Sequence, residues 1–345
     1  MNLPIPLEYA PMEAKLVTSL PKGDDWQFEP KWDGFRCLAF RDGDEVELRS
    51  KSGQPLTRYF PEIESALKRC AAPRFVLDSE IVVPVDGDPS FDHLLQRIHP
   101  AASRVRKLAF ETPACLIVFD LLLDADGSDL TATVLRTRRP ALVAFFHRYL
   151  EPLKGFDLSP CTDDRDVAED WLSGHQGTDG VMAKKLDLPY CSGERTGMQK
   201  VKRMKTADCV VGGIRYAAKG TGVGSLLLGL YGDDGRLHHC GFSSSFTATE
   251  RADVSEKIKP YLHGAGFSGA APGGPSRWAT ERTSEWIPLD PTLVVEVQYD
   301  HWSGGRFRHG TKMLRWRPDK EPRSCTYEQV TAGKGTRDEG KAKIR

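Results

Sequence analysis

The chain has 345 residues, of which 39% are hydrophobic and 28% charged, and this composition is typical of a globular protein long enough for two domains. No apolar run approaches the roughly 20 residues of a membrane span, and the N-terminus does not resemble a secretory signal. The formal net charge is 0, but residues 1–194 hold 23 Lys and Arg against 32 Asp and Glu, whereas residues 195–345 hold 25 against 16. This asymmetry predicts an acidic half and a half that faces a polyanion.

The eight cysteines form no C-x-x-C pair. The sequence therefore predicts neither a disulfide framework nor a zinc site, and it favours the reducing cytoplasm.

Strand-like and helix-like segments alternate in residues 1–204, which predicts an α+β domain. The first strands are expected to form a hairpin over 26–50, with its turn at Asp42-Gly43. A helix over 131–150 contains Pro140, where we expect a kink. The other predicted strands cover 74–85, 114–123, 178–185 and 198–204, and the other predicted helices cover 60–70 and 164–174.

Short strands with Gly-rich turns dominate residues 205–330, and one helix is predicted among them at 248–262. About five strands with one inserted helix are typical of a small Greek-key barrel of the OB type. The polar tail, 331–345, is predicted to be disordered.

Lys31 lies in the run "FEPKWDGFRCLAF" (28–40), where charges alternate with aromatic and apolar residues. These charges could lie on a strand edge that faces solvent. If they are buried instead, each is costly unless it is paired with an opposite charge or takes part in binding or catalysis. A lysine amine attacks phosphorus only when neutral, a form that nearby cations and partial burial favour. Candidate cations are Arg36 in the same run and, on other segments, Arg49, Lys184, Lys185, Lys200, Lys202, Arg315 and Arg317.

These residues together suit attack by Lys31 on the α-phosphorus of a nucleotide, where positioning and charge neutralisation dominate catalysis. Such a reaction needs a divalent metal, for which Glu80 and Asp179 are the candidate ligands. The sequence has no G-x-x-x-x-G-K-[ST] segment, which excludes a P-loop ATPase.

The segment "EPKWDGFR" resembles the K-x-D-G-x-R signature of nucleotidyltransferases that form a covalent lysyl-nucleotide. Six more segments resemble the family's other motifs in the family's order: "LRSKSG", "LDSEIV", "LIVFDLL", "DGVMAKK", "MQKVKR" and "RWRPDKEP". The resemblance covers about residues 10–325 and is strongest to the bacterial stand-alone, two-domain ATP-dependent DNA ligases of the C type. It implies a nucleotidyltransferase domain, with ATP-grasp-like antiparallel sheets and helices, followed by an OB-fold β-barrel.

The resemblance also implies an activity. ATP and Mg²⁺ or Mn²⁺ would be used to seal nicks with a 5′-phosphate and a 3′-hydroxyl, through lysyl-AMP and adenylylated DNA. By similarity, Lys31 is the nucleophile and Glu80 and Asp179 are metal ligands. The resemblance assigns ATP or AMP binding to Glu29, Arg36, Arg49, Glu80, Phe119, Lys184, Lys200 and Lys202, and pyrophosphate orientation to Arg315, Arg317, Asp319 and Lys320.

Two features depart from the family's pattern. Asp179 stands where the family usually has Glu, so its contact with a metal is expected to be longer or to pass through water. No N-terminal DNA-binding domain is recognised, so we expect the two domains to clamp nicked duplex DNA through salt-sensitive phosphate contacts. We further expect a cytoplasmic monomer with a role in DNA repair, no membrane association, and end-joining or base-excision repair proteins as partners.

Other functions remain open from the residues. An RNA ligase or a capping-type guanylyltransferase would share the lysyl-nucleotide chemistry. A catalytically silent OB-type nucleic-acid-binding protein and a Schiff-base lysine enzyme are the alternatives from other classes.

Overall fold

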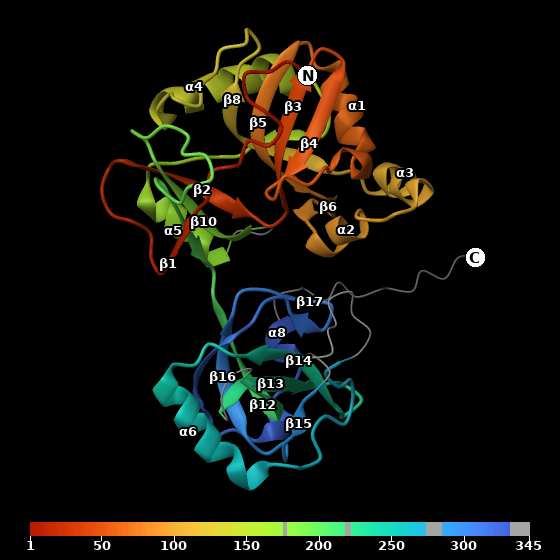
Figure 1. The fold of residues 1–345 in the computed structure, drawn as a ribbon, viewed down its shortest axis with the longest axis vertical. Coiled ribbons are helices and arrows are strands. Elements are labelled where there is room, and N and C mark those ends of the chain that lie inside the picture. The colour runs from red at the N-terminus through yellow and green to blue at the C-terminus, as the bar shows by residue number, and fades with distance from the viewer. Residues whose placement is uncertain (175–177, 218–221, 274–284, 332–345) are drawn as a thin grey trace, which may run out of the picture. The chain divides into compact units, whose positions relative to one another are not determined.

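The computed structural model describes residues 1–174, 178–217, 222–273 and 285–331. The chain folds into two compact units, Met1–Arg203 and Met204–Arg345, each of which is described by itself (Figure 1). The tail predicted to be disordered lies outside the described residues, except for Thr331. No helix among the described residues is long and apolar enough to cross a membrane.

The first unit contains two sheets that are mostly antiparallel. The smaller sheet, sheet A, has the strand order β1-β11-β10-β2, and the larger one, sheet B, has the order β4-β3-β5-β8-β9. The strands of sheet A are β1 (Lys15–Val17), β2 (Trp26–Trp32), β10 (Thr178–Lys185) and β11 (Met198–Lys202). Those of sheet B are β3 (Phe35–Asp42), β4 (Glu45–Ser50), β5 (Arg74–Val82), β8 (Cys115–Leu123) and β9 (Phe156–Leu158), and a separate ribbon joins β6 (Pro84–Val85) to β7 (Asp88–Pro89).

The hairpin predicted over 26–50 is only partly present. The β3–β4 hairpin forms as predicted. Strand β2, however, pairs with β10 in sheet A and is not part of sheet B. The chain crosses between the sheets at Asp33 and Gly34. Gly34 is required there, because a Cβ atom would lie 2.3 Å from the carbonyl oxygen of Ile81 and 2.8 Å from Cγ of Glu80. This crossing places the residues of β2 and β3 in different sheets, although they are neighbours in sequence.

Helices cover the outer faces of the sheets. Helix α4 packs on β8 and α1 on β4, whereas α5 packs on β2 and β10 (Figure 1). Helix α4 continues through Pro140 into a π-helical turn, Phe146–Leu150. Helices α2 and α3 were not predicted; each has a single fully buried residue, Leu94 in α2 and Val105 in α3. The helices of this unit are η1 (Thr57–Tyr59), α1 (Pro61–Arg69), α2 (Phe91–Gln96), α3 (Ala102–Glu111), α4 (Leu135–Phe145), η2 (Phe146–Leu150) and α5 (Arg165–Gly174).

Strand β8 is the centre of the first unit, since all nine of its residues are buried. Leu116 and Val118 face the main core, which sheet B forms with helices α1 and α4. Ile117 and Phe119 point to the other side of the strand, as strand alternation requires. A strand buried on both faces reads as one continuous apolar run, which explains why the sequence predicted it correctly.

The second unit is a small antiparallel barrel with one helix inserted between its strands, and it confirms the OB-type prediction. Its main sheet has the order β14-β13-β12-β16-β19, with β15 paired to β12. The strands are β12 (Lys205–Tyr216), β13 (Val223–Tyr231), β14 (Leu237–Ser243), β15 (Ile287–Pro288), β16 (Val294–Tyr299), β17 (Trp302–Ser303), β18 (Arg306–Phe307) and β19 (Lys312–Trp316). The helices are α6 (Ala248–Ile258), η3 (Lys259–Tyr261), η4 (Pro322–Ser324) and α8 (Glu328–Thr331).

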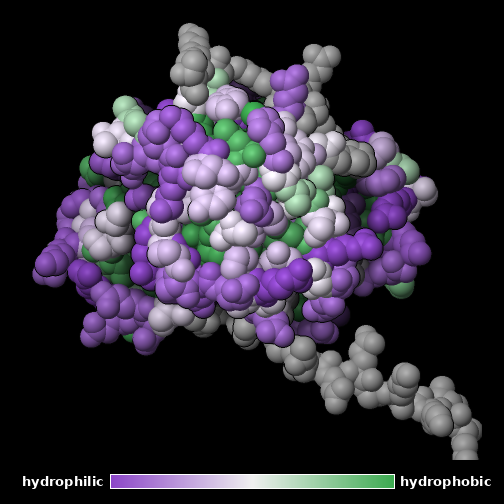
Figure 2. Space-filling model, turned by 90° about the horizontal axis from the view of Figure 1, so that it is seen from below, coloured by the Kyte–Doolittle hydropathy of each residue, from purple (hydrophilic) through white to green (hydrophobic). Residues whose placement is uncertain are grey.

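Hydrophilic side chains cover most of the face shown in Figure 2, where hydrophobic residues appear in small separate areas. Among the coloured residues of that face, none of these areas is a broad apolar patch of the kind that marks a large protein interface.

Candidate active site

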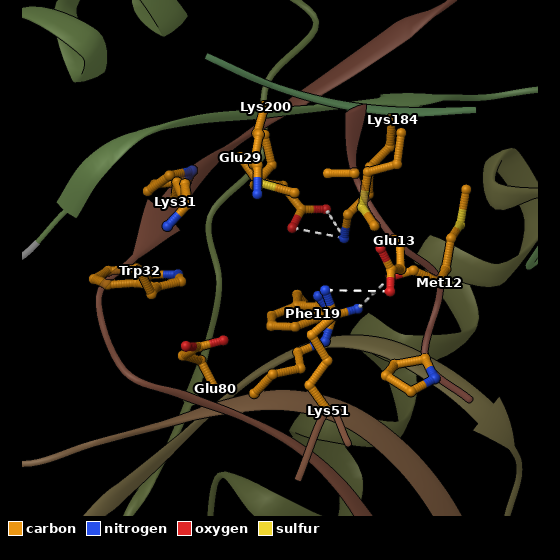
Figure 3. A pocket seen from close by; sticks show the side chains of 16 residues that line it. Met12, Glu13, Glu29, Lys31, Trp32, Lys51, Glu80, Phe119, Lys184 and Lys200 are labelled. Atoms are coloured by element: carbon orange, nitrogen blue, oxygen red, sulfur yellow. Dashed lines mark hydrogen bonds and ion pairs between the residues drawn. The ribbon is translucent and has the colours of Figure 1, made fainter. Parts of the chain in front are cut away.

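A pocket in the first unit is lined by both sheets and by the N-terminal segment (Figure 3). Sheet A contributes Lys31 and Lys200, and sheet B contributes Arg36, Glu80 and Phe119. The complete lining is Pro11, Met12, Glu13, Ala14, Glu29, Pro30, Lys31, Trp32, Arg36, Lys51, Glu80, Phe119, Met182, Lys184, Met198 and Lys200. The structure therefore brings together seven of the residues predicted from the sequence.

Lys31 lies near the end of β2 and donates a hydrogen bond to Asp179 of β10, with 2.6 Å between Nζ and Oδ1. Both side chains are largely buried, at 20% and 13% exposure. A β-bulge in the β2–β10 pairing lies beside Asp179, where the register shifts between Thr178 and Val181. The predicted nucleophile and a predicted metal ligand are thus direct partners.

Glu29 and Lys184 form a buried ion pair across the same two strands. Nζ of Lys184 lies 2.8 Å from each carboxylate oxygen of Glu29, and Nε2 of Gln27 donates a further hydrogen bond of 2.8 Å. Only 2% of Glu29 is exposed, so these donors compensate the cost of burying its charge.

Phe119 presents its ring to the pocket between two cations. The guanidinium of Arg36 lies 4.7 Å from the ring centroid, and Nζ of Lys184 lies 4.6 Å from it. Arg36 is held by Asp78, with 2.5 Å from Nε to Oδ1 and from Nη2 to Oδ2. Burial acts to lower the pKa of Arg36, but the Asp78 carboxylate outweighs it and raises that pKa overall. Arg36 therefore stays charged at the pocket wall.

A buried tyrosine supports this pair from behind. The hydroxyl of Tyr190 donates a 2.5 Å hydrogen bond to Oδ2 of Asp78 and accepts one of 2.9 Å from the backbone N–H of Met12. Asp78, Tyr190 and the N-terminal segment that lines the pocket are thus one connected network.

Glu80 has an unusual environment for a carboxylate. Burial raises its pKa to about 7, although the nearby cations Lys31 and Arg36 act in the opposite direction. An additional cation close to such a buried carboxylate would stabilise its charged form.

Two further lysines point into the cavity, Lys51 and Lys200 (Figure 3). Burial lowers the pKa of Lys200, and the neighbouring charges of Lys31, Lys202 and Lys51 lower it further. Mutual repulsion among cations is relieved when an anion binds, so this corner of the pocket suits phosphate groups.

Four residues of the first unit that the sequence singled out do not line this pocket among the described residues, namely Arg49, Asp179, Lys185 and Lys202. Arg49 lies on β4, where its guanidinium contacts Glu47 at 3.6 Å and the carbonyl oxygen of Gly53 at 3.3 Å. Lys202 lies on β11 two residues beyond Lys200 and is partly buried.

The four residues predicted to orient pyrophosphate lie in the second unit, on β19 and just after it. Arg315 donates a 2.7 Å hydrogen bond to Glu296. Arg317 binds both Asp319 and Asp208, each at 2.9 Å or less, and Lys320 lies 3.4 Å from Asp208. The hydrogen bond from Arg317 lowers the pKa of Asp319 to about 2.

No group of three or more His, Cys, Asp or Glu side chains capable of holding a metal occurs in the described part of the chain. Glu80 and Asp179 are therefore a partial ligand set at most. Mg²⁺ is commonly held by one or two carboxylates together with substrate phosphates and water, and the two residues fit that pattern.

Several lining residues were missed from the sequence. Lys51 follows Arg49 by two residues in the quoted "LRSKSG" segment, but it lies just after β4 ends at Ser50, so strand alternation could not have placed it in the pocket. Trp32, Met182 and Met198 read as ordinary strand residues, and no sequence signal separated them from core positions. Tyr190 lies outside every motif that was considered.

Comparisons with known proteins agree with this geometry. The family model described as "ATP dependent DNA ligase domain" matches residues 11–202, and the "ATP dependent DNA ligase C terminal region" matches residues 219–320. The chain is 44% identical to DNA ligase C1 of Mycolicibacterium smegmatis and 42% identical to DNA ligase C of Mycobacterium tuberculosis, covering 96% of both chains in each case.

A solved structure of mycobacterial DNA ligase D complexed with ATP and MES is similar in fold. It has a TM-score of 0.51 and 30% sequence identity, over 93% of this chain and 98% of that one. With both family models matched in order and close relatives aligned over nearly their whole length, the chain belongs to the family of ATP-dependent DNA ligases.

Proposed function

We propose that Lys31 is the nucleophile of a three-step nick-sealing reaction. Nζ of Lys31 attacks the α-phosphorus of ATP, an N–P bond forms, and pyrophosphate leaves. The AMP group then moves to the 5′-phosphate of a nick, which frees the lysine. Attack of the 3′-hydroxyl on this activated phosphate closes the strand and releases AMP. The observation that supports this most is the position of Lys31, which lines a pocket together with an aromatic ring and several cations and whose amine donates a hydrogen bond to Asp179.

The surrounding residues would divide between the base, the sugar and the phosphates of ATP. Phe119 would stack on adenine, and the buried Glu29–Lys184 pair would bind its edge. Arg36, fixed by Asp78, would hold the ribose. The remaining cations would bind phosphate groups of ATP, AMP or the nick, namely Arg49, Lys200 and Lys202, to which the structure adds Lys51 as a candidate.

A divalent metal, Mg²⁺ or Mn²⁺, would neutralise phosphate charge when bound. We assign Glu80 and Asp179 as its protein ligands, with phosphate oxygens and water completing the shell. The raised pKa of Glu80, caused mainly by burial, supports this assignment, because a buried carboxylate that lacks full charge compensation favours a nearby cation.

Arg315, Arg317, Asp319 and Lys320 would orient the pyrophosphate leaving group in the first step. They gather three cations on one strand end of the barrel, which supports a role with a polyanion.

We further propose that the enzyme acts as a monomer on nicked duplex DNA in the cytoplasm and takes part in DNA repair. The relatives described as multifunctional non-homologous end joining proteins LigD support the repair role and suggest end-joining proteins as partners. The eight cysteines are all free, as expected in a reducing compartment.

Incubation with ATP labelled at the α-phosphate and Mg²⁺ or Mn²⁺, followed by denaturing electrophoresis, tests this function. We expect a stable protein–AMP adduct and none with Lys31→Ala. Lys31→Arg should also fail, because a guanidinium is never neutral in a protein. An adduct that forms at near wild-type rate in either variant would mean that Lys31 is not the nucleophile. In a parallel reaction with labelled GTP, a GMP adduct formed in place of the AMP adduct would redirect the assignment to a guanylyltransferase.

A further inference from the structure

Helix α3 presents a basic face that the nucleotide pocket does not use. Val105 is buried and holds the helix on the first unit, where α3 packs against α1. The residues that are exposed around the opposite side of the helix are Ser103, Arg104, Arg106, Lys107, Phe110 and Glu111, of which Glu111 is the single acidic one. At 100° per residue these side chains share one half of the helix surface, and we call this surface the outer face of α3.

The cations of the outer face have little internal compensation. Within the described ranges, Arg104 and Arg106 have no ion pair, and Lys107 has only Glu111 at 3.7 Å, with both side chains at least half exposed. An exposed pair of this kind contributes little and leaves the lysine available. The 18 residues from 93 to 110 contain no Asp or Glu, although this half of the chain is acidic.

The other acid-free stretch of the first unit behaves differently. In residues 130–150, Arg138 is buried on Asp120 and Arg139 donates to the carbonyl oxygen of Ser159. Arg136 pairs with Asp187 at 2.9 Å. Arg138 and Arg139 are buried and structural, whereas Arg104, Arg106 and Lys107 of α3 are exposed.

Phe110 adds an apolar element to the same face. It is 89% exposed, the highest value among the exposed large hydrophobic side chains. It follows Arg106 by four residues and Lys107 by three, so on a helix it lies beside both cations. A single exposed phenylalanine is ordinary, but this one lies beside Arg106, which has no ion pair in the described residues, and beside Lys107, whose only pair is the exposed contact with Glu111. Such a surface suits a ligand that is both anionic and partly apolar.

The chain connects α3 to the pocket at both ends. Strand β5, with Glu80, precedes the two helices α2 and α3, and strand β8, with Phe119, follows them. Phe91 of α2 packs edge-on against Phe35, next to the crossing at Gly34, with 5.7 Å between ring centroids. Figure 1 shows α3 at the edge of the first unit, clear of the strands that line the pocket.

We propose that the outer face of α3 binds the sugar–phosphate backbone of duplex DNA, outside the nucleotide pocket. This inference rests on the proposed nick-sealing function and adds a specific DNA contact to it. Arg104, Arg106 and Lys107 contact phosphates, and Phe110 packs on deoxyribose at the rim of the minor groove. The contact is independent of base sequence and of the nick itself.

The central test replaces Arg104, Arg106 and Lys107 together by Gln, which keeps the helix-forming tendency and removes three charges. Binding of nicked duplex is measured at several salt concentrations. We expect affinity to fall about 10-fold or more near 0.15 M salt, and the log–log slope to decrease by about 0.9 for each phosphate that the variant no longer binds. Self-adenylylation with ATP should be unchanged, since none of the three residues lines the pocket.

A matched control removes the same charge elsewhere. Lys22, Arg148 and Lys154 are exposed cations of the first unit on other segments, and their triple replacement by Gln lowers the net charge equally. We expect the control to keep nearly the wild-type affinity and salt slope. An equal loss in the control would overturn the proposal, because the effect would then belong to net charge and not to α3.

Phe110→Ala separates the apolar part of the interaction from the ionic part. We expect weaker duplex binding with an unchanged salt slope, because the same number of counterions is released.

The outcomes distinguish this proposal from the function on which it rests. A wild-type protein that neither forms the AMP adduct nor seals nicks would refute the proposed function. If the wild type seals nicks and the triple variant of α3 binds and seals with the same affinity and slope, the α3 proposal fails alone, and the outer face becomes a candidate site for an acidic protein.

Discussion

Asp179 unites two roles at the scale of a single residue, because it accepts a hydrogen bond from Lys31 and is a proposed metal ligand. We expect Asp179→Glu to be tolerated, since it keeps the charge. Asp179→Asn should lower activity about 10- to 100-fold, the range typical of residues that support a metal site. The loss should be largest in the last step, phosphodiester formation, where no triphosphate remains to help hold the metal.

Metal titration of nick sealing with both variants provides the measurement. The Asp179→Asn protein should need more metal than the wild type and than Asp179→Glu. Sealing by Asp179→Asn with the rate and metal dependence of the wild type would contradict the assignment and leave Glu80 as the leading ligand.

Tyr190 allows a second test, of how Arg36 is positioned. Tyr190→Phe removes one donor to Asp78 and leaves the Met12 N–H without its acceptor, so we expect a stability loss of about 1–2 kcal/mol. The KM for ATP in adduct formation should rise several-fold, with a smaller change in the rate at saturating ATP. Tyr9→Phe is the control, because Tyr9 stacks on Tyr190 at 6.1 Å but its hydroxyl is not bonded to Asp78. Equal KM values in both variants would mean that Tyr190 is only structural.

Strand β19 and the residues after it give a prediction at the scale of an element. Arg315 is 64% exposed and Lys320 40%, so replacing either by Ala should leave the barrel folded. We expect both variants to lose self-adenylylation by at least about 10-fold but to seal a nick that is already adenylylated. Arg317→Ala is different, because it leaves Asp208 with fewer partners and should also destabilise the barrel. A similar loss of both reactions in Arg315→Ala would argue against the pyrophosphate role.

Strand β14 makes the barrel sensitive to acid through His239. Burial, together with the nearby charges of Arg306 and Arg215, lowers the pKa of His239 to about 4. Between pH 6.5 and 4, His239 is therefore protonated in the unfolded chain but neutral in the folded barrel. The contribution of His239 to the free energy of unfolding is fully present above pH 6.5 and decreases as the pH falls toward 4. We expect His239→Gln to flatten this part of the pH profile by on the order of 1–3 kcal/mol.

Thermal unfolding from pH 4 to 7.5 measures this effect. The comparison uses the slope of stability against pH, so a constant cost of the substitution cancels. His147→Gln serves as control, because His147 is an exposed residue that pairs with Glu151. Parallel slopes for the wild type and His239→Gln would show that His239 is not responsible.

The charge distribution concerns the whole molecule. A net charge of 0 conceals an excess of nine acidic residues in 1–194 and an equal basic excess in 195–345. If both units contact the duplex, nick sealing should fall steeply with salt, with a log–log slope of several units at roughly 0.9 per contact. A flat dependence between low and physiological salt would contradict clamp-like binding.

The sequence predicted most of the fold where local patterns and tertiary structure agree. Strand β8 and the β3–β4 hairpin follow from an apolar run and an Asp-Gly turn. The division of β2 from β3 could not be predicted, because it depends on pairing with β10, which lies about 150 residues further along the chain. Helices α2 and α3 were missed because few of their residues are buried.

Prediction of the candidate site from sequence was also limited to residues that a local pattern or motif marks. The motif resemblance predicted roles for Lys31 and Phe119, which both line the pocket, and without it Phe119 would read as a core residue. No local pattern could distinguish Arg49 from Lys51 at the pocket, since the choice depends on how the chain turns after β4. Tyr190 and Met182 contribute through contacts that only the folded chain creates.

The pairing of β2 with β10 also has a consequence for how the protein is made. Sheet B draws its first four strands from residues 35–123, so most of it can assemble on the ribosome while later segments are still being added. Lys31 and Asp179 are 148 residues apart, and β1 meets β11 only when residue 199 is available. Until the first unit is almost complete, β2 therefore has no partner strand in the nascent chain, and its apolar side chains and its backbone N–H and C=O groups remain unpaired. A ligase of this design cannot react with ATP during its own synthesis, and a chain stalled before β10 would expose a strand prone to aggregation.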